Sequence, residues 1–459
     1  MLPAAEFPSA VKGIAWPAIP PPAQAAIFAL CAQLEVSQWW PADKIAAMQL
    51  AQADTLLQHA FATVPFYATR LQRRYDPRRP LDWARFRRLP ILTRGDIQSE
   101  FEALHSRRMP DDHGQVKIVR TSGSTGSPIA VLETGFMRAL FAAMHLRGFV
   151  WQRMNFAAAV ASIRVLHGDA RQETESGWVG GIRTGPAYAM DVRTTIDEQI
   201  SWLEQHRPAY LMTLPSNLRA CLKRLTAVNK RLEFLEQVHT YGEIVDDELR
   251  AACHRVLGLP LIDTYSANEL GVLALQAPGT QEFHTADETH IIEVLDDNGE
   301  PCEPGAIGRV VVTPLHNLAS PLIRYANGDY AEVGEPLGDG RGLGVLRRII
   351  GRTRNMAVRP GGERFWPAYG GPSISRIAPL QQVQLIQHTE TTIEVRAVVA
   401  EPVTKAQETE LVAFLQDRLA YPYTISFTYV DAIERGHGQK YEEFICRVDE
   451  PAAAVANPR

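Results

Sequence analysis

Residues 118–131, IVRTSGSTGSPIAV, set hydroxyl side chains and glycines between two aliphatic runs. Successive backbone N–H groups in a turn that glycine permits form a concave anion site, and hydroxyl groups add donors without bulk. The loop is therefore suited to hold a chain of phosphates, with a flexible surface turn as the alternative interpretation. The candidate phosphate-binding residues are Thr121, Ser122, Gly123, Ser124, Thr125 and Gly126.

This loop differs from the two familiar phosphate loops. The Walker loop, GxxxxGK[ST], needs a lysine after its last glycine, whereas Gly126 is followed by Ser127. The dinucleotide-binding pattern GxGxxG is absent as well. A P-loop kinase or GTPase is therefore disfavoured, and positive charge for the phosphates must come from another part of the chain.

Four other stretches carry side chains that fit a nucleotide. In DTYSANELG, Tyr265 could stack on a base and Glu269 could hold a metal ion, although alone they favour a core tyrosine and a surface acid. In PLIRYANGDYAEV, Asp329 is predicted in a glycine turn after a strand, where a carboxylate can accept hydrogen bonds from sugar hydroxyls. Arg352 follows Gly351 in a basic segment that could also be a solvated linker, and Lys440 lies on a late glycine-rich loop.

The elements that must position these residues follow an alternating pattern. Residues 23–75 are predicted to be helical, with Pro65 ending or bending the second helix. Helices are then predicted at 137–151, 216–228 and 245–257, and strands at 209–214, 237–242 and 259–266. This alternation indicates βαβ units in a largely parallel sheet, whose carboxyl-terminal strand ends are where such folds bind ligands.

The pattern changes after residue 288. A hairpin is predicted around the Asp-Asn-Gly turn at 297–299. Beyond Gly351 a hairpin at 382–400, an amphipathic helix at 403–420 and a strand at 423–430 predict a compact α+β unit. We therefore expect an α/β protein with a domain boundary near 351–354, dividing the chain into residues 1–350, with a β-rich subdomain, and residues 351–459.

Composition narrows the class of protein. The chain of 459 residues is 46% hydrophobic and carries a formal net charge of −5, which favours a globular enzyme over a nucleic-acid-binding protein. The cysteines are odd in number and never spaced as CxxC, which predicts neither a disulfide framework nor a zinc site. No run approaches the roughly 18 apolar residues of a membrane span, and the N-terminal segment does not read as a secretion signal. A cytoplasmic protein, monomeric or homodimeric, is expected.

A family resemblance joins these motifs. RTSGSTGSPIAV, TYGEIVDDELR, DTYSANELG, LIRYANGDY, IIGRTRN and a late loop lysine occur in the order and spacing of the adenylate-forming enzymes, the acyl-CoA synthetases and peptide-synthetase adenylation domains. LLQHAFATVPFYATRL and FRRLPILTRGDIQSEF resemble the phenylacetate–CoA ligases in particular. The resemblance covers roughly residues 56–440.

The resemblance implies a reaction in two steps. A carboxylate attacks the α-phosphate of ATP to give an acyl-adenylate and pyrophosphate, and a thiol then displaces AMP. It also implies a role for each motif residue. The 121–126 loop would bind the β- and γ-phosphates with Asn268, and Glu269 would ligate Mg²⁺. Tyr265 would stack near the adenine beside Gly242 and Glu243, and Asp329 would bind the ribose with help from Arg352. Lys440 would reach the carboxylate and the α-phosphate, and Arg354 would lie at the hinge of a mobile small domain.

The residues near the expected acid pocket bear on the choice of acid and acceptor. By resemblance, the acid pocket would be lined near His167, Thr213, His239, Tyr241 and Ala267, which offer aromatic and hydroxyl groups but no obvious cation. A small aromatic acid, phenylacetate- or hydroxybenzoate-like, is expected, with either CoA or an acyl carrier protein as acceptor. The arginines at 70–88 or 347–359 could serve either acceptor.

Three departures from the family pattern keep a second hypothesis open. Asn268 stands where Ser or Thr is usual, Arg354 where Asp or Lys is usual, and Gln439 separates the glycine from Lys440. The alternative is accordingly a degenerate adenylating fold that acts as a non-catalytic nucleotide- or acyl-binding partner protein.

Overall fold

The computed structural model describes residues 7–120, 129–166, 169–174, 177–352, 355–365, 367, 374, 376–433 and 443–448. The chain divides into two compact units, Met1–Ile350, called unit 1 below, and Gly351–Arg459, called unit 2. No helix among these described residues is long and apolar enough to cross a membrane.

Unit 1 begins with helices. They are α1 (Pro22–Ser37), α2 (Ala42–Thr63), α3 (Pro65–Arg70), α4 (Trp83–Arg87) and α5 (Arg94–Ser99), followed by a 3₁₀ turn at Asp111–His113. Pro65 separates α2 from α3, as predicted, because proline is tolerated only in the first turn of a helix. A capping box starts α5, in which the Thr93 and Asp96 side chains each accept a hydrogen bond from the other's backbone N–H.

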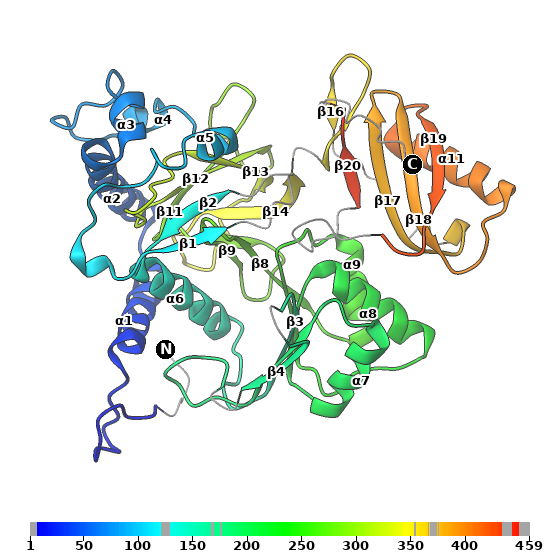
Figure 1. Cartoon of the computed structure of the whole chain (residues 1–459), viewed down its shortest axis with the longest axis horizontal. Helices are drawn as coiled ribbons and strands as arrows, with labels where there is room; N and C mark the ends of the chain where they lie inside the picture. Colours follow the sequence, from blue (N-terminus) through cyan, green and yellow to red (C-terminus); the bar gives the residue numbers. More distant parts are fainter. Residues whose placement is uncertain are drawn as a thin grey trace, which may run out of the picture. The chain divides into compact units, whose positions relative to one another are not determined.

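A hairpin and a long helix come next. Strands β1 (Lys117–Arg120) and β2 (Ala130–Glu133) pair antiparallel, with Val119 opposite Val131. Helix α6 (Gly135–Trp151) follows directly, and the Thr134 hydroxyl caps it by accepting from the Met137 N–H. Figure 1 shows the hairpin above α6.

A mixed sheet of 12 strands forms the body of unit 1, in the order β11-β12-β13-β14-β10-β9-β8-β7-β6-β3-β5-β4. The strands are β3 (Val160–Arg164), β4 (Arg171–Thr174), β5 (Ala187–Asp191), β6 (Tyr210–Thr213), β7 (Gln237–Tyr241), β8 (Leu261–Ala267), β9 (Gly271–Gln276), β10 (Phe283–Thr285), β11 (His290–Leu295), β12 (Ile307–Pro314), β13 (Tyr325–Val333) and β14 (Val345–Arg352).

Among the strand pairs whose register is described, those of the β5-β3-β6-β7-β8 part are parallel. The other pairs whose register is described are antiparallel. The parallel pattern predicted up to residue 266 is confirmed in the parallel strands, and so is the hairpin predicted around residues 297–299, which β11 and β12 form. Short connections after β8 and β11 return the chain as hairpins, and the sheet is therefore mixed.

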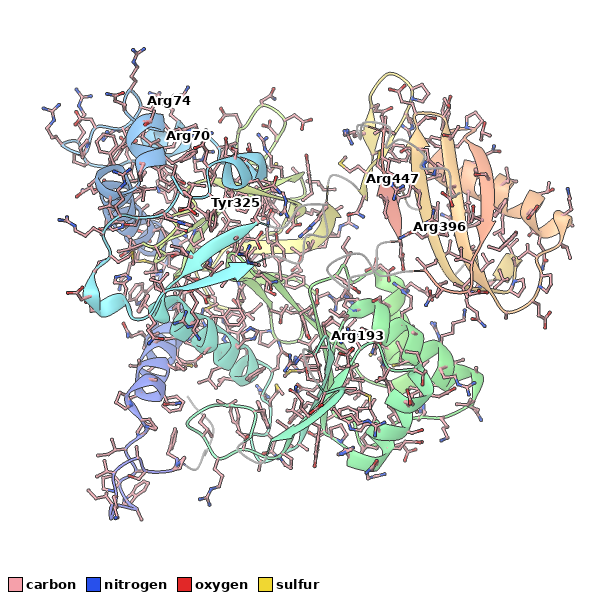
Figure 2. All side chains as sticks on the ribbon, in the orientation of Figure 1. Arg70, Arg74, Arg193, Tyr325, Arg396 and Arg447 are labelled. Atoms are coloured by element: carbon pink, nitrogen blue, oxygen red, sulfur yellow. The ribbon has the colours of Figure 1, made fainter. Side chains whose placement is uncertain are left out.

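Helices α7 (Ile196–His206), α8 (Pro215–Ala227) and α9 (Asp247–Leu257) cover one face of the parallel strands (Figure 1). Their core includes Ala161 and Ile163 of β3, Leu211 of β6 and Val238 of β7. Because side chains alternate along a strand, the residues between these point to the opposite face. A second core packs α2 against β11, β12 and β13, and it contains the fully buried Tyr325 (Figure 2).

Unit 2 is an α+β structure. Its elements are β15 (Ala357–Val358), β16 (Arg364–Phe365), β17 (Leu380–Thr389), β18 (Thr392–Val399), α11 (Lys405–Leu419), β19 (Thr424–Tyr429) and β20 (Phe444–Cys446). A four-stranded sheet has the order β19-β18-β17-β20. Helix α11 buries Leu411, Leu415 and Leu419, which are spaced to share one helical face. The predicted hairpin, helix and strand of this unit are confirmed.

Candidate functional site

Parallel pairing brings the predicted site segments to one edge of the sheet. Thr213 at the end of β6 is level with Ile163 and Thr240, and Tyr241 at the end of β7 is level with Thr264. Strand β8 then runs on to Ala267. The carboxyl ends of parallel strands are where open α/β sheets bind ligands, so this edge is the candidate site.

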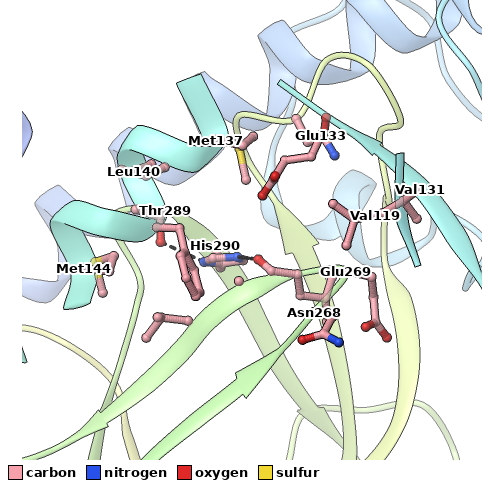
Figure 3. Close-up of a pocket in the computed structure, with 15 residues that line it drawn as sticks. Val119, Val131, Glu133, Met137, Leu140, Met144, Asn268, Glu269, Thr289 and His290 are labelled. Atoms are coloured by element: carbon pink, nitrogen blue, oxygen red, sulfur yellow. Dashed lines mark hydrogen bonds between the residues drawn. The ribbon is translucent and has the colours of Figure 1, made fainter. Parts of the chain in front are cut away.

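A small cavity adjoins this edge (Figure 3). Its lining includes Val119 and Val131 from the hairpin, Met137 from α6, and Asn268 and Glu269 from the turn after β8. The volume is about 20 Å³, roughly enough for one water and far too small for an organic acid. Asn268 is exposed and Glu269 is half-buried, so both residues lie where a ligand can reach them.

The predicted phosphate-binding residues Thr121–Gly126 lie outside the described residues. Their two flanking strands are described, and the pair Val119–Val131 lines the same cavity as Glu269. The ladder ends one residue pair later, at Arg120 and Ala130. The hairpin thus brings the two ends of the predicted phosphate loop next to the predicted metal ligand.

The buried His290 side chain holds the turn that carries Glu269. The Nε2 of His290 lies 2.8 Å from the Leu270 carbonyl oxygen, and the Nδ1 of His290 lies 2.7 Å from the Thr289 hydroxyl (Figure 3). Burial lowers the pKa of His290 to about 4, although the Leu270 and Ala286 carbonyls oppose that shift. His290 is therefore neutral at pH 7, and its Nε2–H donates to Leu270.

This arrangement predicts a loss of stability in acid. Because the pKa of His290 falls from 6.5 in the unfolded chain to about 4 in the fold, its contribution is complete above pH 6.5. It declines as the pH falls towards 4, by roughly 3 kcal/mol. The measurement is urea unfolding from pH 7 to 4, followed by tryptophan fluorescence, because seven of the eight tryptophans precede residue 351.

The comparison that isolates this effect uses two variants. His290→Gln should make the unfolding midpoint less dependent on pH by the share that His290 contributes, while buried His145 and His239 keep theirs. The same change at exposed His254 should leave the pH dependence unaltered. Parallel profiles for wild type and His290→Gln would contradict the assignment of a buried neutral imidazole.

A polar cluster joins β8 to β13. The Tyr265 hydroxyl donates to Asp329 Oδ2 at 2.8 Å, and Asn327 Nδ2 donates to the same two atoms at 2.9 and 2.7 Å, respectively. All three side chains are less than a tenth exposed. The Tyr265 ring belongs to the hydrophobic core, as its sequence alone suggested, and its hydroxyl orients the predicted ribose ligand Asp329.

This cluster requires a curved sheet. Strands β14, β10 and β9 lie between β13 and β8, so a flat sheet would hold Tyr265 and Asp329 about 19 Å apart. Their hydroxyl and carboxylate are 2.8 Å apart because the sheet curls around the core.

The backbone at Asp329 differs from the expected turn. Asn327–Asp329 belong to β13, and the register with β12 shifts there, so the segment is a β-bulge within the strand. Gly328 has a φ of +88°, in the left-handed region that glycine adopts without steric cost. The prediction of a turn after the strand is wrong because this glycine lets the strand bulge and continue.

Gly242 and Glu243 follow β7 and meet the start of α8. Gly242 has a φ of +78°, which bends the chain away from the sheet. The Glu243 carboxylate accepts from the Ser216 N–H at 2.8 Å and from the Ser216 hydroxyl at 3.1 Å. Glu243 thereby binds one backbone N–H in the first turn of α8, where negative charge is favourable.

The predicted acid-pocket residues fall on two faces of the sheet. His239 and Tyr241 alternate with Val238 and share one face, whereas Thr213 is fully buried among α7 and α8 and accepts a hydrogen bond from Asn217 at 3.1 Å. The structure therefore does not bring Thr213 together with the other two. Burial lowers the pKa of His239 to about 4, so it supplies no cation at pH 7.

The remaining predicted residues are mostly outside the described part of the chain. His167, Arg354 and Lys440 are not described. Arg352 is half-buried at the end of β14, and its backbone N–H donates to Asn355 Oδ1 at 3.3 Å.

The donors around Glu269 match magnesium better than zinc. Among the described residues there is no group of three or more His, Cys, Asp or Glu side chains that could hold a metal ion. Mg²⁺ is commonly held by one or two carboxylates together with substrate phosphates and water, so Glu269 beside the predicted phosphate loop is a suitable ligand.

Two residues near the site were not predicted from the sequence. Glu133, the last residue of β2, lines the cavity with Glu269, and burial raises the pKa of its carboxyl. Arg164, the last residue of β3, lies near Tyr241. Neither belongs to a recognisable motif, and only their positions at strand ends near the site distinguish them.

Some of the arginines that could bind CoA or a carrier protein already form ion pairs within the chain. Arg70 on α3 forms an ion pair with Asp96 at 3.4 Å, whereas Arg73 and Arg74, beside the end of α3, are exposed (Figure 2). Arg347 and Arg348 both bind Glu332. This pattern does not favour one acceptor over the other.

Sequence relatives of the chain are ligases. No protein-family model matches it. A phenylacetate–coenzyme A ligase of Thermus thermophilus is 24% identical over 330 residues, covering 69% of this chain and 72% of that protein. The Escherichia coli phenylacetate–coenzyme A ligase is 24% identical over 346 residues, covering 69% and 73%.

Solved structures share the fold. A 2-hydroxyisobutyryl-CoA ligase with a bound acyl-AMP superposes with a TM-score of 0.71 at 18% identity, covering 89% of this chain and 91% of that one. An anthranilate CoA ligase with anthranoyl-AMP has a TM-score of 0.53 at 15% identity, covering 70% and 64%. In its motifs, its sequence relatives and its fold, the chain is similar to the adenylate-forming enzymes, and among them to the phenylacetate–CoA ligases.

Proposed function

We propose that this chain is an AMP-forming acid–thiol ligase. It activates a small aromatic carboxylic acid, phenylacetate- or hydroxybenzoate-like, as an acyl-adenylate. It then transfers the acyl group to the phosphopantetheine thiol of CoA or of an acyl carrier protein. The names of the sequence relatives, phenylacetate–coenzyme A ligases, support this class of reaction.

One observation carries the proposal. The strands that flank the Ser/Gly-rich loop line the same cavity as Asn268 and Glu269, although the hairpin and this turn are far apart in the sequence. A phosphate loop beside a carboxylate suits the triphosphate of ATP with its magnesium ion. Bound Mg²⁺ would neutralise charge on the phosphate oxygens, and Glu269 would hold it.

Other residues bind the ribose, the adenine and the phosphates of the nucleotide. Asp329, oriented by Tyr265 and Asn327, accepts hydrogen bonds from the ribose hydroxyls. Gly242 lies close to the adenine, and Glu243 fixes that segment to α8. Arg352 supports the ribose side, and the loop at 121–126 binds the β- and γ-phosphates.

The proposed reaction has two half-reactions. The acid carboxylate forms a bond to the α-phosphorus as the bond to the bridging oxygen breaks, releasing pyrophosphate. The thiol sulfur then bonds to the acyl carbon as AMP leaves, and the thiol proton is released. Lys440, in unit 2, supplies positive charge to the carboxylate and the α-phosphate during the first step.

An aromatic wall on α6 supports an aromatic acid. Phe141, His145 and Phe149 lie one helical turn apart, with ring centroids 4.4 and 6.2 Å apart along the row. Phe141 lines the Glu269 cavity, and the Phe149 ring meets Trp178 at 5.3 Å. Burial lowers the pKa of His145 to about 4, so the row is uncharged at pH 7. A benzene ring fits such a surface by edge and stacking contacts.

Acid-dependent ATP–pyrophosphate exchange tests the function directly. We expect exchange with at least one member of a panel of phenylacetates and benzoates, and thioester formation when CoA or a phosphopantetheinylated carrier protein is added. Aliphatic acids of equal size are the matched control. Absence of exchange with every acid, together with intact ATP binding, would instead support a non-catalytic binding protein.

A further inference from the structure

Arg164 places a positive charge at the edge of the proposed acid pocket, where the sequence motifs indicated no cation. Ala161 and Ile163 of β3 are buried against α7, α8 and α9, so Ser162 and Arg164 point to the other face. Val160 points to the same face as Ser162 and Arg164, and there it belongs to a small hydrophobic cluster against which Phe149 of α6 packs. Arg164 is exposed at the carboxyl end of the strand.

Tyr241 connects Arg164 to the proposed pocket. Strand β6 lies between β7 and β3, so the Tyr241 side chain reaches across it towards Ser162 and Arg164. Burial raises the pKa of Tyr241 and the Glu243 carboxylate adds to this, while the Arg164 guanidinium and the Ser162 hydroxyl lower it. The tyrosine is therefore a neutral hydroxyl close to a permanent positive charge.

The acids around Arg164 are engaged elsewhere. Its partner across the strand ladder is Asp191, which binds Arg193 through Oδ1 at 2.8 Å and Oδ2 at 2.6 Å (Figure 2). Glu243 binds Ser216. Within the described part of the chain, no carboxylate lies within ion-pair distance of the Arg164 guanidinium. A guanidinium without a carboxylate partner in the protein can bind a carboxylate of a ligand through two parallel hydrogen bonds.

We propose that Arg164, with the hydroxyl groups of Ser162 and Tyr241, binds a second, anionic group on the acid that the chain activates. The inference rests on the proposed function and narrows its substrate class to aromatic acids with a second carboxylate on the ring. The aromatic row of α6 would hold the ring, and Arg164 would select acids whose far end is charged.

The test is ATP–pyrophosphate exchange with phenylacetate and its 3- and 4-carboxy and 3- and 4-hydroxy derivatives. The wild type should prefer one carboxy derivative over phenylacetate by about tenfold or more in kcat/KM. Arg164→Met should remove about tenfold to a hundredfold of that activity and leave exchange with phenylacetate nearly unchanged. Added salt should weaken the preference, because Arg164 is exposed.

Two more variants separate selection from damage to the fold. Arg164→Glu should transfer the preference to 4-(aminomethyl)phenylacetate, a gain of activity that a misfolded protein cannot show. Arg171→Met, at an exposed arginine of β4 in the same sheet, should leave every preference unchanged.

The outcomes that overturn the inference are distinct from those that overturn the function. Exchange with no acid at all would overturn the ligase proposal and this inference with it. Exchange that ignores the second carboxylate, favours the hydroxy acids regardless of Arg164, or falls equally for all acids in Arg164→Met would overturn the inference alone.

Discussion

Replacing Lys440 with alanine is expected to lower the rate of acid-dependent ATP–pyrophosphate exchange by about a hundredfold to a thousandfold. This is roughly the loss of rate that follows removal of one preorganised charge partner. Thioester formation from a synthetic acyl-adenylate should be retained. The difference arises because charge develops on the transferring phosphate only in the first step. In the second step the phosphate is already bonded to the acid and leaves as AMP.

The chain provides a matched control for this experiment. Residues 351–459 contain two lysines, Lys405 and Lys440. Lys405 is exposed in the first turn of α11, and Lys405→Ala should leave both half-reactions unchanged. Lys440 itself lies outside the described residues, and in the sequence it falls between β19 and β20. If both half-reactions survive Lys440→Ala, another group supplies the positive charge.

Removing one partner of the buried Arg147–Glu288 ion pair is expected to cause the largest loss of stability among the substitutions considered. Arg147 of α6 donates to both Glu288 oxygens, at 3.1 and 2.7 Å, and the Ser37 hydroxyl of α1 donates to Glu288 at 2.9 Å. The two charged side chains are 1% and 5% exposed. Glu288→Leu would leave the Arg147 guanidinium buried and unpaired, at a cost of about 3–5 kcal/mol.

A double-mutant cycle measures this coupling. Arg147→Met with Glu288→Leu should recover most of the loss, because removing both charges leaves no uncompensated ion. The free energy of unfolding is obtained from urea midpoints at a constant denaturant slope. Arg224→Met, in the exposed Arg224–Asp197 pair, should cost at most about 1 kcal/mol. A cost below 1 kcal/mol for Glu288→Leu would contradict the structural role of the pair.

This ion pair also bears on the site. Glu288 immediately precedes Thr289 and His290, whose side chains line the Glu269 cavity. The pair therefore anchors α1 and α6 to the segment that supports the turn with Asn268 and Glu269. A destabilised variant should lose pyrophosphate exchange at a lower temperature than the wild type, in proportion to its loss of stability.

The sequence by itself determined the local elements and the motif positions. Pro65 ends α2 as predicted, and the predicted alternation of helices and strands from β6 to β8 is confirmed. These features depend on residues close in the chain, namely proline geometry, capping side chains and apolar spacing, so local patterns suffice to predict them. The same locality made the family motifs recognisable, since each lies within one turn or strand end.

Only the tertiary structure decided which of these residues meet. Tyr265 and Asp329 are 64 residues apart and join only because the sheet curls across three intervening strands. Strand alternation separates Thr213 from Tyr241, and it places Arg164 on the face of Tyr241 although no motif marks it. Strand order, sheet curvature and the facing of each side chain arise from long-range packing, and local periodicity carries no record of them.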